Sequence, residues 1–239
     1  MPGVTDLLAL LGVGFFLGMR HATDPDHVMA VTAIVAREGT ARAAVLVGAL
    51  WGLGHTLTVV VVGSAIAVFG LVVPPRLGLS MEMSAAAMLI VLGAANLSSA
   101  LGQIERQGKL AAGARSHSHA PSLPARPSLR GFVRPLLVGV VHGLAGSAAV
   151  ALLVLATVHS VKWALVYLTV FGVGTMLGML LLTAVMARPL AKTAAWSPVG
   201  RLSLVRLTGF ASLALGLFLV YRIGVVDGLF THAARWTPQ

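Results

Sequence analysis

The chain has 239 residues, of which 57% are hydrophobic and only 10% are charged, and its mean hydropathy is +0.92. A soluble domain carries about 25% charged residues, so this composition argues against a soluble enzyme, a disordered chain and a fibrous protein. The net charge is +10, but Lys and Arg lie between apolar runs, as in membrane proteins, and cysteine is absent, which excludes disulfides and thiolate metal sites.

Six apolar runs approach or exceed the length of about 20 residues that a membrane span needs. They cover Val4–Ala36, Ala43–Val73, Met83–Leu101, Phe132–Val158, Trp163–Ala187 and Leu202–Val226. The first and second runs are too long for one straight crossing, so we expect each of them to tilt or to break. The sequence therefore predicts an all-α polytopic membrane protein with about six transmembrane helices.

The positive charges predict the orientation of these spans. Twelve Lys and Arg lie in or beside the loops after the first, third and fifth runs, and four lie on the other side; Arg20 lies within the first run. The positive-inside rule places the side with more Lys and Arg in the cytoplasm and both termini outside. No Lys or Arg precedes Arg20, so we expect no cleaved signal peptide.

The first run contains a dense polar segment, Arg20-His21-Ala22-Thr23-Asp24-Pro25-Asp26-His27. Each Asp at mid-membrane costs about 2.5–3.5 kcal/mol, so the segment must be buried against protein, water or a cation. On a regular helix His21 and His27 would point about 120° apart. Pro25 lacks the N–H that would continue the helix, so we expect a break that brings both ends of the motif around one point.

The donors of this segment are imidazole nitrogens and carboxylate oxygens, which together suit a divalent transition metal. The candidate ligands are His21, Asp24, Asp26 and His27. A purely structural interpretation is also open, either as a hydrogen-bond network or as an ion pair between Arg20 and an Asp that braces the bundle. Four donors within seven residues favour the metal site.

The second run carries His55 within Leu53-Gly54-His55-Thr56, where small residues allow helices to approach closely. We expect His55 to supply a further ligand. The alternative is a buried histidine that bonds to a backbone carbonyl.

Residues 103–131 are polar and contain three prolines together with Ser116-His117-Ser118-His119. Such a composition predicts a flexible cytoplasmic linker. His117 and His119 are candidates for metal capture, although a solvated loop is the simpler interpretation.

The linker separates two related halves, residues 1–102 and 132–239. Gly18-x-x-His21 matches Gly139-x-x-His142 at an offset of 121, and the segment from Trp51 to His55 matches the segment from Phe171 to Thr175 at an offset of 120. A repeat of three spans must invert its second copy, which predicts an inverted 3+3 repeat. Inverted repeats are common in secondary transporters, with the site near the midplane.

The second half offers fewer donors than the first. His142 is the counterpart of His21 and a weaker candidate ligand, whereas Ser147 and Thr175 stand in place of Asp26 and His55. Gly146 takes the position of Pro25, so we expect the first helix of the second half to break as well. The predicted site is asymmetric.

Residues 21–27 fit the pattern His-x4-Asp-His, and Leu53-Gly54-His55-Thr56 follows in the next span. Together these motifs resemble the nickel/cobalt transporter family, whose signature is that first motif followed by a Gly-His motif. The second half, with Val-His-Gly-Leu-Ala-Gly-Ser at 141–147, looks more like the branch of urease accessory nickel permeases. Family members usually have eight spans and an acidic second-half motif, whereas this chain has six runs and His142-Gly143.

The resemblance implies a secondary permease that takes up Ni(II), and in some members Co(II), across the bacterial plasma membrane. The metal is then the substrate, and no cofactor is bound permanently. The resemblance assigns His21, Asp26, His27 and His55 to metal binding, and it places Asp24 at a variable position that is often Asp. The implied partners are the metal ion, the bilayer and cytoplasmic nickel chaperones or the maturation of urease or hydrogenase, with no nucleic acid.

Three other functions remain open from the residues. A related transporter exports Ni(II) or Co(II), because a binding site does not encode direction. A membrane-embedded hydrolase uses a metal held by His and Asp and its bound water, but no His-Glu-x-x-His motif is present. A bis-histidine haem protein leaves the two Asp unexplained.

Overall fold

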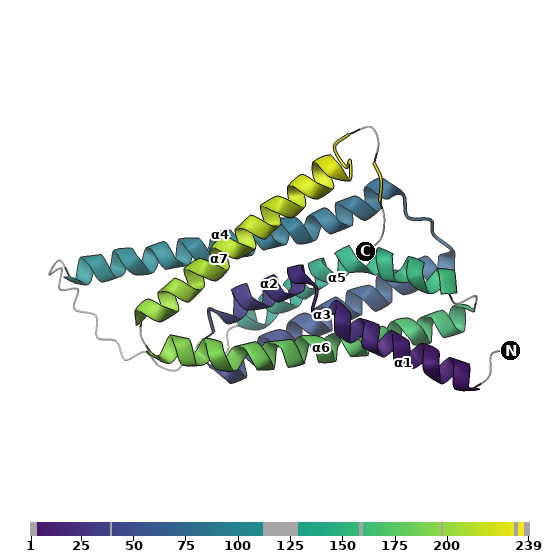
Figure 1. Ribbon diagram of the computed structural model, residues 1–239, viewed down its shortest axis with the longest axis horizontal. Coiled ribbons are helices and arrows are strands. Elements are labelled where there is room, and N and C mark those ends of the chain that lie inside the picture. Colours follow the sequence, from purple (N-terminus) through teal and green to yellow (C-terminus); the bar gives the residue numbers. More distant parts are fainter. Residues whose placement is uncertain are drawn as a thin grey trace.

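The computed structural model describes residues 4–38, 40–111, 129–157, 160–196, 198–231 and 234–236, and every regular element within them is a helix (Figure 1). The helices are α1 (Val4–His21), α2 (Pro25–Val35), α3 (Ala41–Phe69), α4 (Pro75–Ala111), α5 (Leu129–Thr157), α6 (Val161–Trp196), α7 (Pro198–Tyr221) and the short π-helix η1 (Arg222–Val226). The prediction of an all-α protein is confirmed. His117 and His119 lie outside the described residues.

Four of these helices contain segments long and apolar enough to cross a membrane, judged by length and composition. They are Ala41–Phe69, Pro75–Glu105, Val161–Arg188 and Val199–Val226. Three shorter apolar stretches accompany them, Leu8–His21, Pro25–Val35 and Phe132–Gly146. The described part of the chain is thus a multi-pass membrane protein whose apolar helices are of two lengths, and not six equal spans.

Some polar side chains are buried inside the bundle, while many large apolar side chains face outward, as is typical of helices in lipid. On α3, Leu53, Leu57 and Val61 are each at least half exposed, while His55 on the same helix is fully buried. Thr175 of α6 is also fully buried.

The first apolar run breaks where the sequence predicts. α1 ends at His21, and α2 begins at Pro25 after Asp24, which is extended (φ −60°, ψ 146°). Proline suits a first helical position because the N–H that it lacks would have no partner there.

The predicted break in the second half is wrong, because α5 continues through Gly146. Glycine keeps its N–H and has no ring to crowd the preceding carbonyl, so it weakens a helix without ending it.

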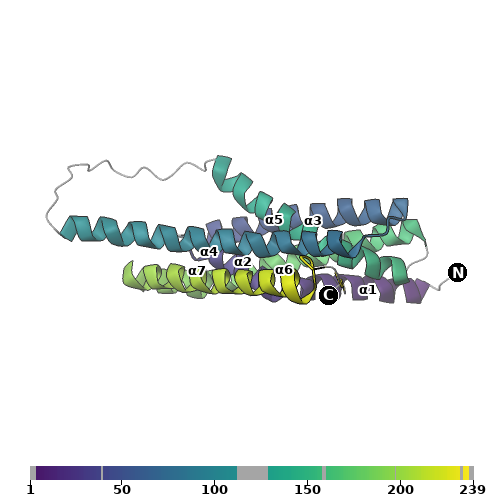
Figure 2. The ribbon, with the colours of Figure 1, turned by 90° about the horizontal axis from the view of Figure 1, so that it is seen from above.

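Two groups of helices build the bundle (Figures 1 and 2). α4 and α7 lie side by side, while α3 packs against α5 and α6, and α1 packs against α6. The short α2 contacts α3, α4, α6 and α7, and its Ala30 and Val31 belong to the main buried cluster, together with Trp51, Leu89 and Met179. The break after His21 therefore places the polar motif at the centre of the bundle.

Glycines allow two pairs of helices to cross at backbone contact. A side chain on Gly18 of α1 would collide with the carbonyl oxygen of Phe171 on α6, and one on Gly139 of α5 would collide with that of Trp51 on α3. The first helix of each half thus packs in backbone contact with a helix of the other half, α1 with α6 and α5 with α3.

The segment predicted as a linker begins later than its composition suggests. α4 extends to Ala111, and α5 begins at Leu129, so both ends of the predicted linker are helical. Residues 104–107 are Ile, Glu, Arg and Gln, and the Glu, Arg and Gln among them favour helix although they are polar.

Candidate metal site

Three histidines from three helices converge at the break in the first run. His21 ends α1, His27 lies in the first turn of α2, and His55 lies in the middle of α3. The ring centroids are 4.7 Å apart for His21 and His27, 5.3 Å for His21 and His55, and 5.0 Å for His27 and His55. One nitrogen from each ring lies within 4.8 Å of the other two, close enough for three ligands of one ion.

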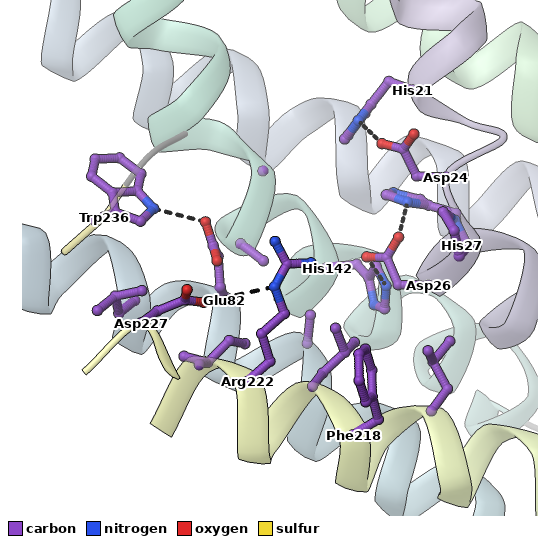
Figure 3. Close-up of a pocket in the computed structure, with 18 of the residues that line it drawn as sticks. His21, Asp24, Asp26, His27, Glu82, His142, Phe218, Arg222, Asp227 and Trp236 are labelled. Carbon is purple, nitrogen blue, oxygen red and sulfur yellow. Dashed lines mark hydrogen bonds and ion pairs between the residues drawn. The ribbon is translucent and has the colours of Figure 1, made fainter. Parts of the chain in front are cut away.

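Two carboxylates orient two of these rings (Figure 3). The Nδ1–H of His21 donates to Asp24 at 2.8 Å, and the Nδ1–H of His27 donates to Asp26 at 3.2 Å. A neutral imidazole that donates from Nδ1 has its lone pair on Nε2. Metal-binding histidines in proteins almost always donate their other ring N–H to a carboxylate, a backbone carbonyl or water.

The free nitrogens of the cluster are buried. His27 is 2% exposed and His55 is fully buried. Among the residues that the structure describes, the Nε2 atoms of His21 and His27 and both nitrogens of His55 have no hydrogen-bond partner. Unpaired buried polar atoms are costly and call for an explanation, and a bound cation provides one.

His142 of α5 joins the cluster through Asp26. Its Nε2 lies 3.2 Å from the second oxygen of Asp26, and its ring centroid lies 4.9 Å from that of His27. Asp26, His27 and His142 form a second group whose donor atoms lie within 4.8 Å of one another. The structure thus brings all six residues predicted as ligands to one region, and Asp24 reaches it through His21.

These contacts bear on the two structural interpretations of the polar segment. Both carboxylates face histidines, so an ion pair between Arg20 and an Asp does not account for the motif. A hydrogen-bond network among the described residues accounts for the carboxylates but leaves the nitrogens named above unpaired.

Trp51 closes one side of the cluster. Its ring is fully buried, and its centroid lies 5.6 Å from that of His27 and 5.7 Å from that of His142. Trp51 is therefore a packing residue of this cluster.

A cavity of about 480 Å³ leads to the histidines. His21, Asp26, His27 and His142 line its inner end, whereas the fully buried His55 lies behind them on α3. At the other end it is lined by the first turns of α4, the last turns of α7 and the segment after η1.

The sequence analysis missed several charged residues of this cavity. Glu82 on α4 accepts a hydrogen bond of 2.7 Å from the indole N–H of Trp236, and Arg222 lies 4.0 Å from Asp227 (Figure 3). Glu82 is the one ionisable residue between Arg76 and Glu105, which is a signal for function inside an apolar helix. The predicted third span began one residue too late to include it.

The chemistry of the inner group is that of a borderline metal ion. Three imidazole nitrogens suit nickel, copper, iron or zinc, whereas a site for magnesium or calcium would present mainly oxygen. The described donors of this group supply three nitrogens.

Comparison with known proteins identifies relatives of the chain. A family profile described as "NicO: High-affinity nickel-transport protein" matches residues 7–133, which contain the broken first run and His55. The chain is also similar to the urease accessory protein UreH of Bacillus sp. (strain TB-90), with 34% identity over 225 residues, 94% of this chain and 96% of the relative. No solved structure matches the chain significantly.

Proposed function

From the premise that the chain belongs to the NicO family of high-affinity nickel-transport proteins, and so moves nickel across a membrane, we propose that it is a secondary permease for Ni(II) uptake. Membership of this family sets the hydrolase interpretation aside, because the family transports its metal and is not a family of enzymes. Nickel is therefore the substrate and not a resident cofactor. We place the protein in the bacterial plasma membrane, in line with its bacterial relative.

We assign the transported ion to the three imidazoles of His21, His27 and His55. The observation that carries this assignment is the set of buried, unpaired nitrogens on rings whose other nitrogens are held by Asp24 and Asp26. In this proposal the carboxylates orient the rings and balance the charge of the ion. Ni(II) binds such donors more tightly than Co(II), so Co(II) is the weaker of the two substrates.

The two halves are proposed to form an inverted repeat. Followed along the chain in Figures 1 and 2, α5, α6 and α7 run opposite to α1, α3 and α4 respectively. The glycine crossings support the same relation. Gly18 contacts Phe171, and their repeat counterparts, Gly139 and Trp51, contact each other in the same way. A second matched pair adds weight, since Gly174 meets the carbonyl of Phe15 and Gly54 meets that of Leu136.

The cavity supports uptake as the direction of transport. It opens beside the start of α4 and the end of α7, the side that the positive-inside rule places outside the cell. In this orientation the histidines are reached from the outside. We propose that the ion is released to the cytoplasm, where nickel chaperones or the maturation of urease or hydrogenase take it over. The name of the bacterial relative, a urease accessory protein, fits such a destination.

The test is metal flux into proteoliposomes, compared for Ni(II), Co(II), Zn(II) and Mn(II) at a fixed membrane potential. We expect saturable Ni(II) uptake, weaker Co(II) uptake, little Mn(II) uptake and loss of uptake in His27→Ala. The matched control replaces both His117 and His119 with Ser, since these lie in the predicted linker. At saturating Ni(II), the control should transport at the rate of the wild type.

Two results would overturn the proposal. If His27→Ala transported normally at wild-type expression while the linker variant lost flux, the transport site would lie elsewhere. If Mn(II) competed as well as Co(II), the imidazole assignment would be wrong.

A further inference from the structure

Asp26 and His142 hold two donor atoms at a distance that suits joint binding of an ion. Asp26 Oδ2 and His142 Nε2 are 3.2 Å apart. Around a metal such as zinc, nitrogen and oxygen ligands lie at about 2.0–2.2 Å, so both atoms can reach one ion placed between them. The pair offers one oxygen and one nitrogen, unlike the all-nitrogen group of His21, His27 and His55.

The pair lies at the inner end of the cavity, on the near side of the fully buried His55. Asp26 is 28% exposed and lines the cavity, as does His142, whereas His55 is fully buried and lies behind them. A carboxylate suits a hydrated cation, because it is charged and can bind while the ion still keeps water. An ion bound at Asp26 and His142 keeps open positions on its cavity side.

His27 connects the pair with the three-imidazole group. It belongs to both sets of donors, and its ring centroid lies 4.9 Å from His142 and 5.0 Å from His55. Its Nδ1 faces Asp26, while its Nε2 has no partner among the described residues. An ion can therefore pass from one side of this imidazole to the other without leaving protein ligands.

We propose that Asp26 and His142 form a receiving position, at which Ni(II) binds before it moves past His27 to His21, His27 and His55. The proposal rests on the proposed function, because it divides the same transport site into two steps. It gives the second half of the chain a direct part in transport, since among the described residues His142 is the histidine that this half contributes to the cluster. When the ion binds there, it takes the place of any proton shared by Asp26 and His142, and the proton leaves to solvent through the cavity.

The experiment compares two buried histidines by the same substitution, His142→Gln and His55→Gln, in purified full-length protein. Equilibrium Ni(II) affinity is measured by calorimetry, and the rate of binding by stopped-flow tryptophan fluorescence, because Trp51 contacts the cluster. We expect His55→Gln to weaken equilibrium affinity about 10–100-fold. His142→Gln should leave affinity within about threefold and slow association by about tenfold or more.

The wild type provides a test that does not depend on the folding of a variant. Binding should show a fast phase whose rate rises with Ni(II) concentration, followed by a slower phase whose rate does not. X-ray absorption at one equivalent of Ni(II) should show three imidazoles in the wild type and in His142→Gln.

A single phase in the wild type would overturn the receiving position. So would equal losses of affinity in His142→Gln and His55→Gln, which would indicate one undivided site, or a His142→Gln variant with unchanged kinetics. Failure of the proposed function has a different signature, namely no imidazole-bound Ni(II) in the wild type at all.

Discussion

At the scale of single residues, the site depends on how each carboxylate is used. Asp24 and Asp26 are the acidic residues of the polar segment Arg20–His27, and both accept hydrogen bonds from histidine Nδ1 groups. A carboxylate that receives an N–H raises the basicity of the opposite nitrogen and fixes the ring. Their main contribution to binding is therefore made through His21 and His27.

Asp24→Asn should weaken Ni(II) binding about tenfold. The side chain of Asp24 is 47% exposed, so its loss should not prevent folding, but the amide lacks the charge that holds the Nδ1–H of His21. Calorimetry in detergent measures the effect. Asp227→Asn is the matched control, because Asp227 lines the same cavity and pairs with Arg222 instead of a histidine. Equal losses in the two variants would indicate a general effect of cavity charge.

Transport should weaken in acid. Nitrogens that bind metal must be unprotonated, so protons compete with Ni(II) for His21, His27 and His55. Between pH 7.5 and pH 5, at fixed membrane potential, the half-saturating Ni(II) concentration should rise while the maximal flux stays nearly constant. A half-saturating concentration that does not change with pH would argue against imidazole ligands.

The sequence identified the ligand types better than their roles. The density of His and Asp, with Pro25 among them, indicated a site at a broken helix, and the break is present. The contact between His142 and Asp26 depends on how α5 lies relative to α2 in the bundle, which no local pattern encodes. Glu82 was not predicted as a site residue because a single charged residue beside an apolar run indicates the end of a span.

At the scale of helices, small residues set how closely the two halves approach. Where a glycine faces a backbone carbonyl, the axes of two helices lie closer than any side chain would allow. Such crossings hold α1 on α6 and α5 on α3, the helices that carry or flank the histidines.

Gly18→Ala should destabilise the protein, by about 1–3 kcal/mol, because the new methyl group meets the backbone of Phe171 and Thr175. Gly12→Ala is the control on the same helix, since nothing lies within 4 Å of a methyl group there. That change should be neutral or slightly stabilising, as alanine favours helix over glycine by roughly 0.5–1 kcal/mol. Thermal unfolding in detergent distinguishes the two variants, and equal midpoints would contradict the close crossing.

The helices themselves could be predicted from the sequence, but their ends could not. Apolar runs mark the helices because every backbone group must be satisfied in lipid. The end of α4 lies among polar residues that favour helix without being apolar, and α5 passes through Gly146, whose effect depends on its surroundings. Proline interrupts a helix through its own ring and its missing N–H, so the break at Pro25 was predicted correctly.

At the scale of the whole molecule, the cavity and the charge distribution together define two sides. One end of the cavity is lined by the start of α4 and the end of α7, and the sequence has most Lys and Arg in the loops that we predict on the opposite side. The positive-inside rule predicts which of these sides faces the cytoplasm after the protein inserts into the membrane, and it does not itself give the direction of transport.

The orientation is directly testable because the chain contains no cysteine. Val72 in the α3–α4 loop is 87% exposed, and Val199 at the start of α7 is 70% exposed. In intact cells, a membrane-impermeant maleimide should label Val72→Cys and should label Val199→Cys only after permeabilisation. Both variants replace an exposed valine with cysteine, so each serves as the control for the other. The reverse pattern would place the cavity mouth in the cytoplasm and favour export.

The reciprocal glycine crossings also bear on the biogenesis of the protein. α1 and α3 emerge from the ribosome before α5 and α6, the helices against which they pack, have been synthesised. Until then Gly18 and Gly54 expose bare backbone, and the early histidines lack the cover that the later helices provide. A chain truncated between the halves therefore offers quality-control proteases an unfinished membrane domain. Two halves translated separately should still assemble, because the glycines of these crossings and the residues that they meet lie outside residues 103–131.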